Sequence, residues 1–312
     1  KLHFKTSCRF FLAGPSEVRF KMVEELTFEL IDVRFCCHVL EVSCSGFYAW
    51  LKRPLSKRKT EDERIWQKIK RHWEDSRKTY GRRPLTKKLQ NEGEVIGKNR
   101  VARIMKENNI QGVGKKKFKP QTTTSNHELP VAERIFKTEV ADEQVTKPNQ
   151  YWGGDITYVA TEEGWLYLAI VIDLFTRKVV GHSMNESMPC ELVINALDMG
   201  LKRQGLVTAE NLITHTDRGS QYAAQDYIDK LAEYKITASM SRKGNCYDNA
   251  FVESFFRTLK VELVHREKFK TRSEAKQKIF EFIEVWYNRQ RLHSSLDYQT
   301  PEQYESKQLT AA

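Results

Sequence analysis

Residues 165–173 read WLYLAIVID, a nearly continuous apolar run with the length of one strand. A run without polar alternation is typical of a central strand that is covered on both faces. A β-rich segment at 155–161 and a turn at 162–164 precede it, and another strand is expected at 178–184. These three neighbouring strands predict the centre of a sheet, and the rest of the fold can be built outward from them.

Helices and strands alternate after the third strand. We expect them at 189–203 (helix), 212–215 (strand), 223–234 (helix), 235–240 (strand) and 249–265 (helix). Three strands followed by this alternation predict an α/β domain, in which helices flank a mixed five-stranded sheet. We place this domain at 149–266, with a helical extension at 267–312.

Three carboxylates stand in distinctive surroundings within this domain. Asp155 lies in WGGDITY, Asp217 in HTDRGSQY and Glu253 in GNCYDNAFVES. Two strands and a helix could bring them together as oxygen ligands, which Mg²⁺ prefers. We expect two metal ions about 4 Å apart, with Asp155 bridging both and the other two carboxylates each completing one coordination sphere. Such a site cleaves or joins phosphodiesters without a covalent protein intermediate.

The last helix would hold Glu253 at the edge of the core. Its apolar face is formed by Val252, Phe255, Phe256, Leu259 and Leu263. Arg257 and Lys260 follow Glu253 on the neighbouring stripe, where they are expected to contact a phosphate backbone. Taken singly, Glu253 could simply pair with Arg257, and either aspartate could cap a strand end.

Positive charge is concentrated on the N-terminal side of the domain that holds the three carboxylates. The chain has a net charge of +11, yet residues 51–120 hold 23 basic and 8 acidic residues, and the rest carries a net −4. This polarity indicates one module that grips nucleic acid and another that performs the chemistry.

Helical patterns fill the first part of the chain. Residues 1–30 show no clean period, and 31–54 predict a short helix-turn-helix, so we place an N-terminal segment at 1–55. A basic, helix-turn-helix-like DNA-binding domain is expected at 56–112. Its last helix has an apolar stripe, and the opposite face carries Arg100, Arg103 and Lys106, as in a recognition helix. The alternative is a solvated basic face.

A basic linker is expected at 113–148, because this segment lacks periodicity. Lys115, Lys116 and Lys117 within it are candidate contacts to the DNA backbone.

The six cysteines contain no C-x-x-C pair, so we interpret them as reduced thiols. No apolar run approaches the roughly 20 residues of a membrane helix. We expect a cytoplasmic protein without a membrane partner.

Several motifs together resemble a known family. Asp217 and Glu253 have 35 residues between them, and Lys260 follows Glu253 by seven. The chain also contains YGRRP at 80–84, WYNRQRLHSSL at 286–296 and TPEQY at 300–304. In these features it resembles the DDE transposases of bacterial insertion sequences, specifically the OrfB-type protein of the large two-frame family, whose core is similar to retroviral integrase.

The resemblance implies an RNase H-like core that depends on Mg²⁺ or Mn²⁺. It also implies cleavage at transposon ends, joining of the freed 3′-hydroxyl to target DNA, and multimers on paired double-stranded DNA ends. A first-frame partner protein and a location at the bacterial nucleoid follow from the same likeness.

Two other functions remain open at this point. A nuclease of the same fold acting on RNA·DNA hybrids would need the same metals, and a catalytically silent DNA-binding regulator would need none.

Weaker candidates lie around these motifs. Asp173 and His215 could support the carboxylates, although a structural Asp and a packed His are the favoured interpretations. Near the C-terminus, Trp286, Tyr287 and Leu292 are expected to pack on the core, and Arg289, Arg291 and His293 are plausible backbone contacts.

Overall fold

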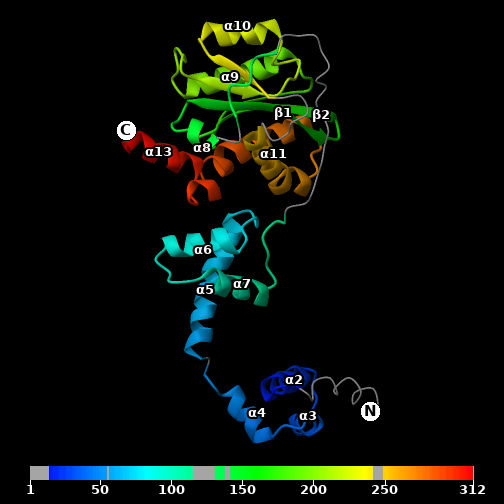
Figure 1. Ribbon diagram of the computed structural model, residues 1–312. Coiled ribbons are helices and arrows are strands. Elements are labelled where there is room, and N and C mark those ends of the chain that lie inside the picture. Colours follow the sequence, from blue (N-terminus) through cyan, green and yellow to red (C-terminus); the bar gives the residue numbers. More distant parts are fainter. Residues whose placement is uncertain (1–13, 55, 115–130, 138–140, 242–248, 312) are drawn as a thin grey trace. The chain divides into compact units, whose positions relative to one another are not determined.

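The structure is a computed structural model that describes residues 14–54, 56–114, 131–137, 141–241 and 249–311 (Figure 1). The chain divides into two compact units, residues 1–67 and 68–312, and each is described by itself.

The first unit is a small helical domain. It contains α2 (Ser16–Phe28), α3 (Val33–Val39), α4 (Cys44–Leu51) and the start of α5 (Lys57–Asp75). Its core is formed by Val23, Leu26, Cys36, Cys37, Leu40 and Phe47. The Asp32 carboxylate caps α3, and the Ser43 hydroxyl caps α4 by accepting from Gly46 N. The expected helix pair at 31–54 is therefore present, and α2 adds a helix where the sequence showed no clear period.

The second unit begins with a helical module. Here α5 continues and is followed by α6 (Arg82–Asn91) and α7 (Lys98–Glu107). The buried side chains of α7 are Val101, Ile104 and Met105, as the apolar stripe predicted. This stripe turns Lys106 outward, which fits the expected helix-turn-helix.

The remainder of this unit is built on a five-stranded sheet. Its strands are β1 (Tyr151–Thr161), β2 (Gly164–Asp173), β3 (Val179–Asn185), β4 (Ile213–Thr216) and β5 (Thr237–Met240). Their order is β3-β2-β1-β4-β5, with β1–β2 and β2–β3 antiparallel and β1–β4 and β4–β5 parallel. This confirms the mixed sheet, and β2, the WLYLAIVID strand, is buried over most of its length.

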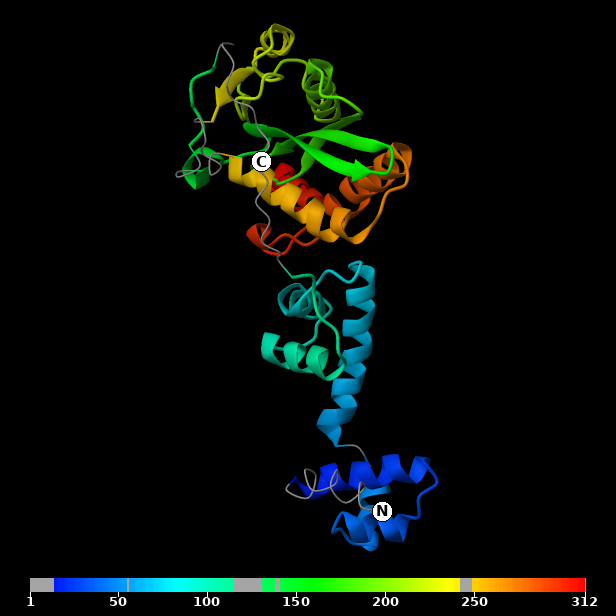
Figure 2. The same cartoon turned by 90° about the vertical axis from the view of Figure 1, so that its right-hand side faces the viewer.

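Helices cover both faces of the sheet (Figure 1). On one face lie α9 (Cys190–Arg203) and α10 (Gln225–Glu233), which share one apolar core with the sheet. The opposite face is covered by α11 (Ala250–Glu262), α12 (Arg272–Glu281) and the π-helical turn η4 (Phe282–Tyr287). Figure 2 shows α11 running along the strands on that face. Shorter elements are α8 (Ala141–Gln144), η3 (Val264–Arg266), η5 (Ser294–Leu296) and α13 (Pro301–Ala311).

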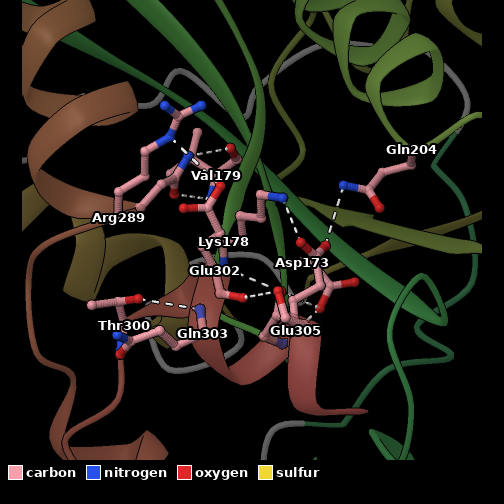
Figure 3. A network of polar contacts seen from close by, with 12 residues as sticks. Asp173, Lys178, Val179, Gln204, Arg289, Thr300, Glu302, Gln303 and Glu305 are labelled. Atoms are coloured by element: carbon pink, nitrogen blue, oxygen red, sulfur yellow. Dashed lines mark hydrogen bonds and ion pairs between the residues drawn. The ribbon is translucent and has the colours of Figure 1, made fainter. Parts of the chain in front are cut away.

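A polar network ties the turn between β2 and β3 to α13 (Figure 3). The Asp173 carboxylate accepts hydrogen bonds from the backbone N–H groups of Asn149, Phe175 and Thr176 and from the Thr176 hydroxyl. Lys178 pairs with Glu305, which also accepts from the Gln204 amide. Asp173 is thus occupied in holding a turn, so the structural interpretation of this residue is confirmed.

The YGRRP and WYNRQRLHSSL motifs meet inside the second unit. The Tyr80 hydroxyl accepts from Leu292 N at 2.7 Å and donates to Gln290 O at 3.4 Å, and its ring lies 5.7 Å from that of Trp286. Trp286, Tyr287 and Leu292 are buried, as expected. The two motifs therefore form one packing contact between the helical module and the C-terminal segment.

Candidate active site

The sheet places Asp155 and Asp217 at the same end of neighbouring strands. Gly154 on β1 is paired with Thr216 on β4 in parallel register, so the two aspartates are the next residues along the two strands. Asp155 Oδ1 accepts a hydrogen bond from Ile156 N at 2.7 Å, and Asp217 Oδ1 accepts one from Gly219 N at 2.9 Å. Both carboxyl groups are therefore held by the backbone that follows them.

Helix α11 brings Glu253 to this end of the sheet. The close packing depends on Gly153, where an added Cβ would lie 2.7 Å from Val252 Cγ2. Asn249 contributes a tether, because its Nδ2 donates to Gly154 O at 3.3 Å, directly before Asp155. Asn249 stands at the N-cap position of α11, but its side chain makes no capping hydrogen bond and holds the helix to β1.

The electrostatics links the three carboxylates. The pKa of Asp155 is raised well above its usual range, first by burial, then by the charge of Asp217, and to a smaller extent by that of Glu253. Burial also raises the pKa of Glu253, and the nearby Arg257 opposes that rise. A carboxyl group that is desolvated among like charges favours the protonated form or a bound cation.

Lys260 interacts electrostatically with Asp155. Its Nζ is 5.3 Å from the centre of the Tyr158 ring. Burial lowers the pKa of Lys260, and the charge of Asp155 opposes that effect. Arg257 is exposed one turn earlier on α11. Lys260 thus contributes positive charge at the carboxylates, and Arg257 contributes it at the surface.

The coordination cage itself stays a prediction. Within the described ranges, no three His, Cys, Asp or Glu side chains are grouped closely enough to hold a metal ion. The donor set nevertheless fits a hard divalent cation, since it consists of carboxylate oxygens and the pKa values of Asp155 and Glu253 are both raised.

Tyr222 is a residue that the sequence reasoning missed. It is buried, and burial and the charges of Asp155 and Asp217 raise the pKa of its phenol. A Cβ at Gly154 would lie 3.5 Å from its hydroxyl. Its position in HTDRGSQY was visible, but only the fold shows that the ring packs in the core that α9 and α10 form with the sheet, where the charges of Asp155 and Asp217 act on it.

The weaker candidates have structural roles. His215 is buried, and its Nδ1 lies 2.9 Å from Ser239 Oγ, so the packed-histidine interpretation is confirmed. Arg291 forms a bidentate pair with Glu262 at 2.9–3.1 Å, which occupies the guanidinium that was considered for DNA. Burial, together with the charges of Arg291 and Arg177, lowers the pKa of His293 to about 4. His293 is therefore neutral near pH 7 and a poor phosphate ligand. Arg289 pairs with Glu302 at 3.6 Å and is the more exposed of the two arginines, so it stays a predicted backbone contact.

The proposed DNA-binding residues are distributed over described and undescribed parts of the chain. On α7, Arg100 and Arg103 are partly exposed and Lys106 is exposed, with Arg103 paired to Glu107 at 2.8 Å. Lys115, Lys116 and Lys117 lie outside the described residues. No helix in the ranges that the structure covers is long and apolar enough to cross a membrane, and the four described cysteines are not joined in disulfides.

Comparison with known proteins gives matches along most of the chain. Two models of the integrase core domain match residues 145–246 and 234–301, and a model of an HTH-like domain matches residues 60–118. An uncharacterised 31 kDa protein of insertion element IS600 from Shigella sonnei is 45% identical over 87% of this chain and 97% of its own length. Transposase InsF of insertion sequence IS3A from Escherichia coli (strain K12) is 40% identical over 89% of this chain and 95% of its own length.

Solved structures give weaker likenesses. A simian T-cell lymphotropic virus intasome chain, in a complex with the PP2A regulatory subunit B56 gamma, is 15% identical with a TM-score of 0.43, covering 72% of this chain and 70% of that one. The HTLV-2 integrase catalytic core domain, solved in complex with magnesium, is 17% identical with a TM-score of 0.38, covering 51% of this chain and 97% of that one.

Proposed function

Because the chain belongs to the insertion-sequence transposases with an integrase core, we propose that it cleaves DNA at transposon ends and joins the freed 3′-hydroxyl to target DNA through Asp155, Asp217 and Glu253. The family establishes a polynucleotidyl transferase, and the triad and the strand transfer are our proposal. The observation that supports it most is the parallel register of β1 and β4, which places Asp155 and Asp217 at neighbouring strand positions while α11, which carries Glu253, packs on β1.

We propose that Asp155, Asp217 and Glu253 would hold two Mg²⁺ or Mn²⁺ ions. Divalent cations bound in this way lower the pKa of an attacking hydroxyl and stabilise the leaving oxygen of a phosphodiester. A doubly charged ion also offsets the repulsion that acts on Asp155.

The chain's own residues would orient the reacting groups. The hydrogen bonds from Ile156 N and Gly219 N limit the rotation of the two aspartates, and the tether from Asn249 limits the movement of α11. Lys260 and Arg257 supply positive charge for the phosphates that flank the scissile bond. No side chain needs to form a covalent bond with the DNA.

Double-stranded DNA is the proposed partner, both as transposon ends and as target. We propose that Arg100, Arg103 and Lys106 on α7 bind the ends, with Lys115, Lys116 and Lys117 as further contacts. Assembly of several copies on paired ends, and association with a first-frame protein, belong to the same proposal.

The domain division also stays a proposal, with one change. We retain the boundaries near 55, 112 and 266. The segment expected as a linker at 113–148 contains Phe136, which is 1% exposed and packs on β1, β4 and α11. The catalytic domain therefore begins before residue 149, because part of its core is supplied by this segment.

A joining assay tests the proposal. A labelled donor end, a target plasmid and Mg²⁺ should yield joined product with the parent protein. Asp155→Asn, Asp217→Asn and Glu253→Gln should each reduce cleavage and joining by at least about 10³-fold, since each removes a charge that acts on the reacting phosphate. DNA binding and the unfolding transition should change little.

Asp229→Asn is the matched control, because Asp229 is an exposed aspartate on α10 that accepts a hydrogen bond from Gln225 in the same helix. It should leave joining unchanged. Cleavage without joining would favour a nuclease, and end binding without any metal-dependent cleavage would favour a silent regulator. Full activity in one triad variant would remove that residue from the site.

A further inference from the structure

Phe136 is a fully buried aromatic side chain in a segment without regular secondary structure. The backbone around it is fixed on two sides. Ile135 N and Phe136 N both donate to the Ser239 hydroxyl on β5, at 3.0 and 3.1 Å. On the other side the Gln144 side chain accepts from Lys137 N and donates to Ile135 O. The ring is therefore held in place and is not a loosely packed loop residue.

The Phe136 ring contacts all three elements that carry the proposed metal ligands. Its centroid lies 5.4 Å from that of Tyr151 on β1, 5.1 Å from His215 on β4 and 6.1 Å from Phe251 on α11. These distances are in the range of favourable aromatic pairs. One rigid ring thus spans the junction of two strands and a helix.

The three contacted residues stand in a simple relation to the carboxylates. Tyr151 precedes Asp155 by four residues, and His215 precedes Asp217 by two. Residues an even number apart on a strand lie on the same face, so Phe136 packs on the face of β1 from which Asp155 projects. Asp217 directly follows the end of β4, two residues after the contacted His215. Phe251 precedes Glu253 by two and is the second residue of α11.

We propose that Phe136 is a positioning residue for the carboxylate triad: by filling the junction of β1, β4 and α11 it sets the spacing of Asp155, Asp217 and Glu253. This inference rests on the proposed function, because it assigns a purpose to the spacing of those three groups. Ser239 supports the same arrangement, since its hydroxyl holds the Phe136 backbone and also contacts His215 Nδ1. A ring that only filled the core would affect stability and nothing else.

Metal binding by the free, full-length protein distinguishes the two roles. Isothermal titration calorimetry with Mn²⁺ alone should show that Phe136→Ala weakens triad-dependent binding by about 10- to 100-fold, as loss of supporting groups around metal ligands does elsewhere. Phe136→Met retains most of the buried volume but not the rigid ring, and it should give an intermediate loss. In joining assays the kcat should fall in the same order while the KM for donor DNA stays unchanged.

Phe269→Ala is the control. Phe269 is 2% exposed, and it pairs with Thr161, six residues and about 20 Å further along β1 than Asp155. Phe269→Ala should lower the free energy of unfolding, as Phe136→Ala does, without changing the affinity for Mn²⁺. If Phe136→Ala fails to fold, Phe136→Met and Ser239→Ala test the positioning role in its place. Both substitutions should weaken Mn²⁺ binding.

Two negative results would be distinguishable. If the parent protein binds Mn²⁺ in a way that Asp155→Asn abolishes, but the Phe136 variants bind it as tightly as the parent or lose no more affinity than Phe269→Ala, the positioning role is wrong and the triad stands. If the parent shows no binding that depends on Asp155, the triad and the role of Phe136 are both wrong.

Discussion

At the scale of single residues, the site depends on how closely α11 approaches β1. Gly153 permits this approach, since a Cβ there would meet Val252 Cγ2 at 2.7 Å and Leu174 Cδ2 at 3.0 Å. The glycine pair before Asp155 was visible in the sequence, but the neighbour that requires Gly153 was not. Packing against another element, and not a special backbone conformation, explains this glycine.

Gly153→Ala should therefore destabilise the protein by about 1–3 kcal/mol, which is typical of an overpacked core. The shift of α11 that relieves the clash should also displace Glu253 and lower joining activity. Denaturant unfolding and the joining assay measure the two effects. Gly114→Ala is the control, because nothing lies within 4 Å of its Cβ position. Equal stability of the two variants would show that the Val252 side chain can move aside without a loss of folding free energy.

At the scale of elements, an ion-pair network joins β3, α9 and η4. Glu284 Oε1 lies 2.8 Å from His182 Nε2 and 2.5 Å from Arg203 Nη1. Burial raises the pKa of Glu284, but the hydrogen bonds and charges of His182 and Arg203 more than offset that effect, so its pKa lies below the usual range. The network therefore stabilises the fold only while Glu284 is ionised.

This network predicts a pH-dependent stability. A lowered pKa in the folded state gives stability that is complete above the usual Glu pKa of about 4.3 and is lost as the pH falls through the folded-state value. Glu284→Gln should cost about 1–3 kcal/mol near pH 6, and the difference from the parent should shrink toward zero in acid. Urea unfolding between about pH 3 and pH 6 measures it.

The exposed pair of Glu210 and Lys235 provides the comparison for that experiment. Glu210→Gln should change the unfolding free energy by less than about 0.5 kcal/mol at every pH, as exposed pairs usually do. A difference between the parent and Glu284→Gln that stayed constant down to pH 3 would contradict the assignment.

Helix α7 is the second element with a measurable role. If it binds DNA ends, log K should fall with log salt at a slope of about −0.9 for each phosphate neutralised, and replacing Arg100, Arg103 and Lys106 by Ala should flatten that slope. Replacing Lys202, Lys276 and Lys307, which are exposed on α9, α12 and α13, removes the same charge elsewhere. Equal slopes of log K against log salt for the two triple variants would show that α7 does not contact the DNA ends.

At the scale of the whole molecule, the chain contains separate cores. The core around Phe47 in the first unit shares no residue with the core that α9 and α10 form with the sheet. Units with separate cores can unfold independently, so a single two-state transition is not expected.

Calorimetry of the full-length protein should then show more than one transition. Phe47→Ala should lower the free energy of unfolding of the first unit by about 3–5 kcal/mol and leave the temperatures of the other transitions unchanged. Phe255→Ala, on α11 in the second unit, should do the reverse. One cooperative transition that both variants shift together would show that the two units unfold as one.

The amino-acid sequence alone determined the order of the elements, the mixed sheet and the family. Apolar runs and helical periods reflect local rules, and the motifs around Asp155, Asp217 and Glu253 can be recognised without coordinates. Helix ends were predicted to within a few residues, as at α11, which was expected at 249–265 and spans Ala250–Glu262.

The tertiary structure decided which side chains surround the carboxylates. Phe136 packs on β1, β4 and α11, Tyr222 packs in the core of α9 and α10, and Asn249 bonds to Gly154. No local pattern in the sequence marks these contacts. It also showed that Arg291 pairs with Glu262 and that Asp173 holds a turn. These roles arise from contacts between residues distant in the sequence, whose distances are set only when the strands pair and the helices pack on them.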